Sequence, residues 1–168
     1  MIDLPLVLSP MSHADLPALD RLDARAFGPG RFARSAYRLR EAAEPDYALS
    51  FVAHVGTLLV GANRMTAIAC GGHPALLLGP LTVEPAFHKR GIGAVLVTRS
   101  LEAARVAGHR LVLLVGDAPY YSRFGFKVVP RGQLAMPGPV DPARLLVCEL
   151  VEGAFAGVGG VVGRGVTG

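Results

Sequence analysis

The chain has 168 residues, of which 51% are hydrophobic and only 18% are charged. This composition excludes a disordered tail or an acidic solvating segment, because so much apolar material must be buried in a core, and the length suits a single domain. The longest aliphatic runs, Leu76–Leu78 and Leu111–Val115, are much shorter than the roughly 18 to 20 residues that span a bilayer. No membrane partner is therefore expected.

Positive charge is spread along the chain. Seventeen Lys and Arg residues stand against thirteen Asp and Glu residues, and no aromatic side chains are interleaved with them to stack bases. We expect a mildly basic solvated surface or a site for a small polyanion, and no nucleic acid as partner. The chain lacks an export signal after Met1, which predicts a cytoplasmic protein. Cys70 and Cys148 lack the spacing of a metal site, which predicts reduced core cysteines and no metal.

The N-terminal part predicts a strand and a helix. A short apolar strand over 4–8 is followed by Ser12 and Asp15, whose spacing resembles a capping box. The helix after this box is expected to extend to about Phe27, because Gly28-Pro29-Gly30 then breaks it. Its buried stripe is expected to consist of Leu16, Leu19, Leu22 and Ala26.

The middle of the chain predicts a second short helix and three strands. The second helix has three cations along one face, interpreted as a solvated stripe: Arg31, Arg34 and Arg38. The runs 47–54 and 57–70 predict an antiparallel hairpin. A further strand over 74–83 contains Gly79-Pro80, which indicates a bulge, and bulges often redirect backbone groups beside a site.

The C-terminal part predicts a mixture of helices and strands before a glycine-rich end. The expected elements are a helix over 91–107, a buried strand over 110–116, a short helix after Pro119, and strands over 126–129 and 144–150. This order predicts one α/β (α+β) domain built on a mixed sheet. Residues 153–168 contain seven glycines, and taken alone they favour a flexible tail.

The segment with the clearest chemistry is His88-Lys89-Arg90-Gly91-Ile92-Gly93-Ala94, between a predicted strand and a predicted helix. Its glycines allow close approach of a ligand, and the first helical turn points unpaired N–H groups outward at the positive end of the helix dipole. A phosphate or pyrophosphate is the expected ligand of this segment. The alternative is that the segment is an ordinary loop that binds no ligand. Ala94-Val95 stands where a Walker A loop needs Lys-Ser/Thr, and Leu96 replaces the third small residue of a dinucleotide fingerprint, which argues against ATP and NAD.

Three motifs extend this reading: Leu81-Thr82-Val83-Glu84-Pro85, then His88-Lys89-Arg90-Gly91-Ile92-Gly93, then Tyr120-Tyr121-Ser122-Arg123-Phe124-Gly125-Phe126. Together they resemble the GNAT superfamily of acetyl-CoA-dependent N-acetyltransferases, in particular its YhbS-like bacterial branch. The resemblance implies a GNAT-like mixed, mostly antiparallel central sheet of about seven strands flanked by about four helices. It covers nearly the whole chain, so 1–168 is expected to be a single N-acetyltransferase domain. The first residues of the glycine-rich segment 153–168 would then be ordered.

The resemblance implies acetyl-CoA as cosubstrate. Backbone groups of Leu81, Thr82 and Val83 would pair with the pantetheine arm as an added strand does. The other residues that the resemblance implies for cofactor binding are His88, Lys89, Arg90, Gly91, Ile92, Gly93, Ala94, Asp117 and Tyr121. His88 departs from the Gln or Arg that similar proteins have at this position, which would make its contribution dependent on pH.

The resemblance also implies how protons move. Tyr121 stands four residues before Gly125, where the family's general-acid tyrosine lies, and it would protonate the leaving thiolate. The residues alone favour a packing role for Tyr121. With Tyr121 as the acid, Tyr120 would be the packing residue, although the two tyrosines are adjacent and could exchange these roles. Glu84 and Asp117 are candidates for the general base, with an ordered water as the alternative, and each also has a purely structural interpretation.

The predicted function is therefore transfer of acetyl from acetyl-CoA to a primary amine of a small molecule or protein, by a monomer or homodimer. The alternative is a non-catalytic acyl-CoA-binding sensor or partner-binding module. The face of Arg31, Arg34 and Arg38 would form a wall of the acceptor site, which favours an acidic acceptor.

The family's strand order also implies that two strands lie between Cys70 and Cys148. The two cysteines would then be roughly 14 Å apart, which is too far for a disulfide.

Overall fold

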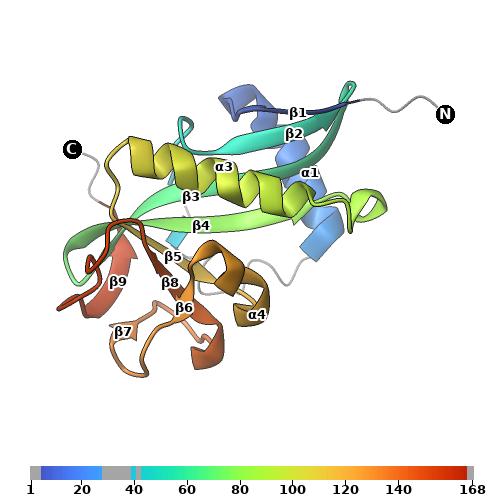
Figure 1. The fold of residues 1–168 in the computed structure, drawn as a ribbon. Helices are drawn as coiled ribbons and strands as arrows, with labels where there is room; N and C mark the ends of the chain where they lie inside the picture. The colour runs from blue at the N-terminus through green and yellow to red at the C-terminus, as the bar shows by residue number, and fades with distance from the viewer. Residues whose placement is uncertain (1–4, 28–38, 41–42, 166–168) are drawn as a thin grey trace.

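The computed structural model describes residues 5–27, 39–40 and 43–165 (Figure 1). Its helices and strands are β1 (Leu6–Pro10), α1 (Leu16–Phe27), β2 (Phe51–Val55), β3 (Leu58–Cys70), β4 (His73–Val83), α3 (Ile92–Val106), β5 (Leu111–Val115), α4 (Ala118–Tyr121), β6 (Lys127–Val128), β7 (Leu134–Ala135), β8 (Leu145–Glu149) and β9 (Gly160–Arg164). Within these ranges, no helix has the length and apolar character needed to cross a bilayer. The helix predicted around Arg34 lies outside the described residues.

The strands form one sheet in the order β1-β2-β3-β4-β5-β8-β6, and β9 pairs with both β3 and β7. Pairing is antiparallel except between β4 and β5 and between β7 and β9. The predicted mixed, mostly antiparallel sheet is confirmed. The strands of the main path are those that the sequence predicts, whereas β7 and β9 are additional.

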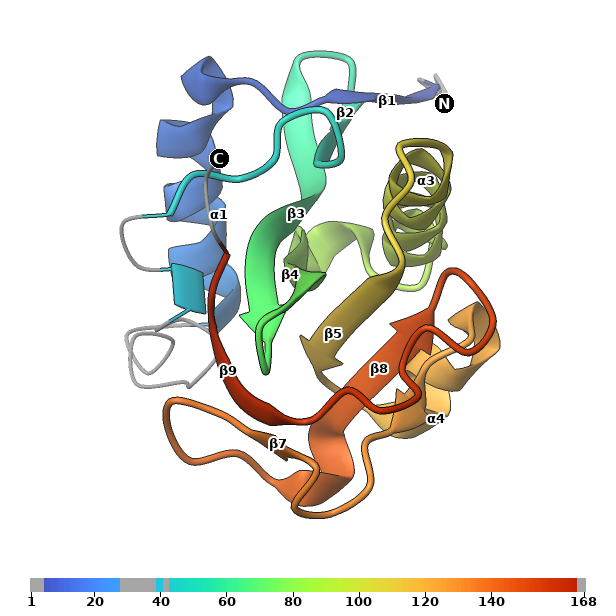
Figure 2. The same ribbon diagram turned by 90° about the vertical axis from the view of Figure 1, so that its left-hand side faces the viewer.

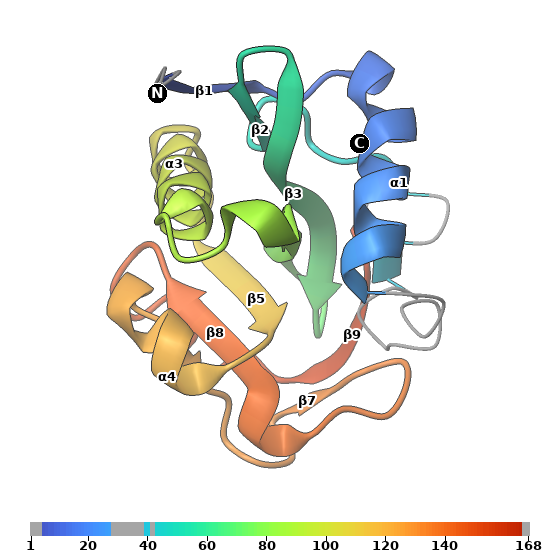
Figure 3. The same cartoon turned by 90° about the vertical axis from the view of Figure 1, so that its right-hand side faces the viewer.

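Helices α1 and α3 cover opposite faces of the sheet (Figures 2 and 3). On one face, Val97 and Leu101 of α3 pack in a cluster with Leu76 of β4 and Leu114 of β5. On the other face, Leu19 of α1 packs in a cluster that draws on β2 and β3. The central strands are therefore apolar on both faces, as the continuous aliphatic run in β5 indicates.

The buried side of α1 differs from the predicted stripe. Leu19 and Leu22 are buried as expected, but Ala26 is exposed and Asp23 is buried in its place. Thr82 of β4 donates a hydrogen bond to the Asp23 carboxylate, so this polar side chain is satisfied while it faces the sheet. A pattern of apolar residues cannot reveal such a partner.

Strand β4 is irregular where the sequence predicts a bulge. A register shift leaves Arg64 of β3 opposite two residues, Gly79 and Pro80, and the peptide bond between these two is cis. The extra residue bends β4 and changes the direction of the backbone that follows. The predicted bulge is confirmed.

Strands β4 and β5 separate after a short stretch of parallel pairing. The hydrogen-bonded ladder between β4 and β5 ends at Leu77 of β4, whereas β4 remains paired with β3 as far as Val83. The Glu84 amide donates to a carbonyl of β3 at 2.8 Å, and in an antiparallel pair alternate residues bond to the same neighbour. Thr82 therefore also bonds to β3, and the backbone groups of Leu81 and Val83 face the gap left by β5.

The C-terminal segment is ordered further than the sequence predicts. Strand β9 pairs antiparallel with β3 and parallel with β7, and Val158 and Val162 are buried. Taken alone the segment favoured a flexible tail, whereas the resemblance implied order for its first residues, and the structure pairs it as a strand as far as Arg164. The glycines permit close backbone contact, because a Cβ on Gly71 would lie only 1.8 Å from the carbonyl oxygen of Gly159.

Both cysteines are free and buried. Cys70 lies on β3 and Cys148 on β8, and β4 and β5 separate these strands. The predicted absence of a disulfide is therefore confirmed. Burial raises the pKa of Cys70 to about 11 and also raises the pKa of Cys148, so both thiols stay protonated near neutral pH.

Candidate functional site

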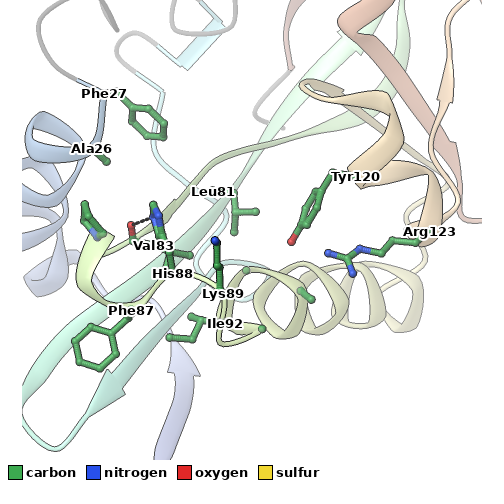
Figure 4. Close-up of a pocket in the computed structure, with 14 residues that line it drawn as sticks. Ala26, Phe27, Leu81, Val83, Phe87, His88, Lys89, Ile92, Tyr120 and Arg123 are labelled. Carbon is green, nitrogen blue, oxygen red and sulfur yellow. Dashed lines mark hydrogen bonds between the residues drawn. The ribbon is translucent and has the colours of Figure 1, made fainter.

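A cavity of about 390 Å³ lies where the end of β4 meets the start of α3 (Figure 4). Its walls come from the last turn of α1, the edge of β4, the loop before α3, the first turn of α3, and the α4 region. The residues that line it are Ala26, Phe27, Leu81, Val83, Pro85, Phe87, His88, Lys89, Gly91, Ile92, Gly93, Ala94, Tyr120 and Arg123.

The loop before α3 adopts an unusual backbone conformation. Lys89 has φ 66° and Gly91, the N-cap of α3, has φ 76°, so both lie in the left-handed region. Such a conformation disfavours a side chain at Lys89, and strain of this kind is found preferentially at ligand sites. No side chain caps α3, so the N–H groups of its first turn are available to an anion in the cavity.

Gly93 keeps the mouth of the cavity open. A Cβ at this position would lie 3.1 Å from the Tyr120 hydroxyl and 3.5 Å from Cδ2 of Leu81. Any side chain here would therefore fill the space between α3, β4 and α4. Its φ is not in the left-handed region, so the requirement for glycine comes from space rather than from backbone conformation.

Two cationic side chains, Lys89 and Arg123, are among the residues that line the cavity. Lys89 lines it from the loop, and Arg123 lines it with its guanidinium 4.3 Å from the centroid of the Tyr120 ring. The Nε2 of His88 donates to the Val83 carbonyl at 3.1 Å, as the dashed line in Figure 4 marks. Arg90 does not line the cavity, and its guanidinium lies 4.9 Å from the Phe87 ring centroid instead. The electrostatic character of the site suits an anionic ligand.

Most of the predicted binding residues meet in this cavity. Those that line it are Leu81, Val83, His88, Lys89, Gly91, Ile92, Gly93 and Ala94. Thr82 turns its side chain to α1, which leaves its backbone to pair with β3. Asp117 is exposed at the N-cap of α4 and is not part of the lining.

The two adjacent tyrosines occupy different environments. Tyr120 lines the cavity and points its hydroxyl toward the start of α3 (Figure 4). Tyr121 does not line it, and its ring packs 5.9 Å from the Phe126 ring and close against Gly116, which follows β5. Burial raises the pKa of Tyr121 to about 12. Tyr121 therefore packs beside the apolar core, whereas Tyr120, the packing residue implied by the resemblance, faces the cavity.

The candidate bases also lie outside the cavity wall. Glu84 accepts from Arg25 at 2.9 Å, and 21% of its side chain is exposed. Asp117 is exposed, and its side chain accepts no capping hydrogen bond from the backbone of α4. Across the described residues, no three His, Cys, Asp or Glu side chains gather as a metal site would require.

Several lining residues were not predicted from the sequence. Ala26 and Phe27 come from the last turn of α1, which is far from β4 in the chain, and no local pattern links the two. Arg123 follows Tyr120 by three residues, and this spacing on one helical face would have indicated that they project together.

Comparison with known proteins agrees with the fold. A family model described as an acetyltransferase (GNAT) domain matches residues 46–128. The uncharacterized N-acetyltransferase YjhQ of Escherichia coli K12 is 30% identical over 148 residues, which cover 85% of this chain and 81% of that protein. The chain belongs to the GNAT family. Another member, the uncharacterized N-acetyltransferase YhbS of Escherichia coli K12, is 27% identical over 150 residues, which cover 88% of this chain and 89% of that protein.

Two solved structures of family members resemble the fold closely. Escherichia coli YhbS in complex with CoA superposes with a TM-score of 0.81 at 25% identity, covering 96% of this chain and 90% of that one. A Brucella melitensis GNAT acetyltransferase in complex with acetyl-CoA gives a TM-score of 0.63 at 27% identity, and the match covers 90% of this chain and 98% of that one. The predicted GNAT fold is therefore confirmed.

Proposed function

We propose that this chain is an N-acetyltransferase that uses acetyl-CoA to acetylate a primary amine of a small molecule or protein, with residues 1–168 acting as one domain. The observation that carries the proposal is the meeting of the free edge of β4 and the uncapped start of α3 in a single cavity. The CoA and acetyl-CoA complexes of the two family members support it.

The free edge of β4 suits the amide-bearing pantetheine arm. Leu81 and Val83 direct backbone groups into the gap beyond the end of the β5 ladder, where an extended chain can add as a strand. The Val83 carbonyl accepts from His88 in this structure, so an added strand would share or displace that hydrogen bond. Thr82, between them, holds the strand against β3. The thioester supplies an acetyl group already activated for attack by an amine.

The start of α3 suits the phosphates. The backbone N–H groups of Arg90, Gly91, Gly93 and Ala94 and the positive end of the helix dipole would bind the pyrophosphate. Lys89 brings positive charge into the same cavity. Arg123, which the resemblance did not assign, would add a second cation from the α4 side.

Acetyl transfer also needs two proton movements. An ammonium acceptor must lose a proton before attack, and the proposed acceptor of that proton is Glu84 or Asp117, acting directly or through an ordered water, because neither side chain lines the cavity. The departing thiolate must gain one, and we assign this donation to Tyr121 beside the end of β5, with Tyr120 as the rival phenol. Proton donation of this kind is worth about 10² to 10⁴ in rate.

The proposal is tested first by binding. Acetyl-CoA at 100 times its Kd should stabilise the folded chain by about 2.7 kcal/mol, measured as a rise in Tm. Gly93→Val should abolish the rise, because its side chain would fill the cavity beside Tyr120. Gly163→Val is the matched control, because a Cβ at Gly163 meets no atom within 4 Å and should leave the rise intact.

Turnover is tested by acetyl-CoA-dependent release of CoA with a panel of amines and peptides. Release with an amine, and none with Gly93→Val, is the expected result. No rise in Tm for the wild-type chain at millimolar acetyl-CoA would contradict the proposal. Binding without release across the whole panel would favour the acyl-CoA sensor instead.

A further inference from the structure

Helix α1 and strand β4 are joined by a buried hydrogen bond behind the cavity. The Thr82 hydroxyl donates to Oδ1 of Asp23 at 2.6 Å, and the two residues are 2% and 8% exposed. Oδ2 of the same carboxylate lies 3.4 Å from Nη2 of Arg64 on β3. With both oxygens engaged, Asp23 is arranged to hold its neighbours rather than to exchange a proton with a substrate.

A carboxylate is a costly choice at this position of α1. Burial raises the pKa of Asp23 above its ordinary range and is the dominant influence, although Thr82 and Arg64 lower it. The other buried residues of α1, Leu19 and Leu22, are apolar, and an apolar residue at position 23 would avoid the desolvation. What the carboxylate supplies is a directed bond that fixes the position of Thr82.

This bond links two walls of the cavity. On β4, Thr82 lies between Leu81 and Val83, which both line the cavity. On α1, one helical turn after Asp23, Ala26 and Phe27 line it as well. Figure 4 shows these two groups approaching the cavity from separate elements. The distance between the walls therefore depends on the Asp23–Thr82 bond.

We infer that Asp23 and Thr82 are positioning residues for the proposed acetyl transfer. Their hydrogen bond holds the outward backbone groups of Leu81 and Val83 at the spacing from α1 that the cofactor's extended arm requires. The inference rests on the proposed function, and neither side chain touches the reacting atoms. Loss of the bond should therefore weaken acetyl-CoA binding, raising its Kd and KM, with a smaller effect on kcat.

The test uses Thr82→Val, which keeps the shape of the side chain but removes the hydroxyl, together with Asp23→Asn. Both should raise the Kd for acetyl-CoA about 10-fold, because a hydrogen bond to a charged group is lost or weakened. Thr82→Ser retains the hydroxyl and should stay within about twofold of wild type. Asp20→Asn is the matched control, because Asp20 contacts the same Arg64 at 3.3 Å but has a side chain that is 72% exposed.

A second readout does not depend on the cofactor. The amides of Thr82 and Glu84 bond to β3, and their hydrogen exchange should be faster in Thr82→Val than in wild type, Thr82→Ser or Asp20→Asn. Unchanged Kd and unchanged exchange in folded Thr82→Val would overturn the inference, as would an equal loss of binding in Asp20→Asn. If wild type binds no acetyl-CoA, the proposed function fails, and the exchange data still decide whether the bond positions β4.

Discussion

Tyr120 and Tyr121 are adjacent in the chain but should affect different steps. The Tyr120 hydroxyl lies at the start of α3, where phosphate is expected, so Tyr120→Phe should raise the Kd for acetyl-CoA several-fold with little change in kcat. Tyr121 stays protonated across the working pH range, because burial raises its pKa to about 12. Tyr121→Phe should lower kcat by about 10² or more at unchanged Kd. Steady-state kinetics and calorimetry separate the two effects, and the opposite pattern would assign proton donation to Tyr120.

These residues show what a sequence can predict about the site and what it cannot. The phosphate-binding segment 88–94 was predictable because glycines, cations and a helix start are local features of the chain. Which tyrosine faces the cavity was not, because adjacent helical residues project about 100° apart and packing alone fixes the rotation of a helix as short as α4. Asp23 was missed because only its partner Thr82, 59 positions away, explains a carboxylate on a buried face.

Helix α3 has a buried hydroxyl that should lower its stability. Ser100 is 0% exposed, and its Oγ has no hydrogen-bond partner within the described part of the chain. Ser100→Ala should therefore raise the free energy of unfolding by about 1 kcal/mol, since it removes an unsatisfied group and favours the helix. Urea denaturation measures the change.

Ser50 provides the matched control for the same substitution. It is also 0% exposed, but its hydroxyl donates to the Asp46 carbonyl at 2.7 Å and accepts from the Met65 amide at 2.9 Å. Ser50→Ala should lower the free energy of unfolding by about 1 to 3 kcal/mol. A loss of similar size in Ser100→Ala would mean that a partner satisfies its hydroxyl in solution.

The strands that the sequence predicted are those with continuous or alternating apolar residues, such as 111–115 and the hairpin of β2 and β3. Strand β9 was missed because glycine lowers strand propensity and the segment has no pattern of its own. It forms because β3 leaves an edge free at Ile68 and Cys70, where β9 pairs. Such pairing joins residues that are about 90 positions apart, which no local window contains.

At the scale of the molecule, β9 pairs with Ile68–Cys70 of β3, away from the part of β4 that lines the cavity. The contribution of β9 to stability can therefore be measured separately from ligand binding. Val162 is 1% exposed and packs in the core cluster with Ile68, so Val162→Ala should lower the free energy of unfolding by about 2 kcal/mol. Val161, 71% exposed, is the matched control, and Val161→Ala should stay within about 0.5 kcal/mol. Neither residue lines the cavity, so the Kd for acetyl-CoA should be unchanged in both. Equal and small effects would mean that β9 is not held against β3 in solution, and that the rest of the sheet supports the site without it.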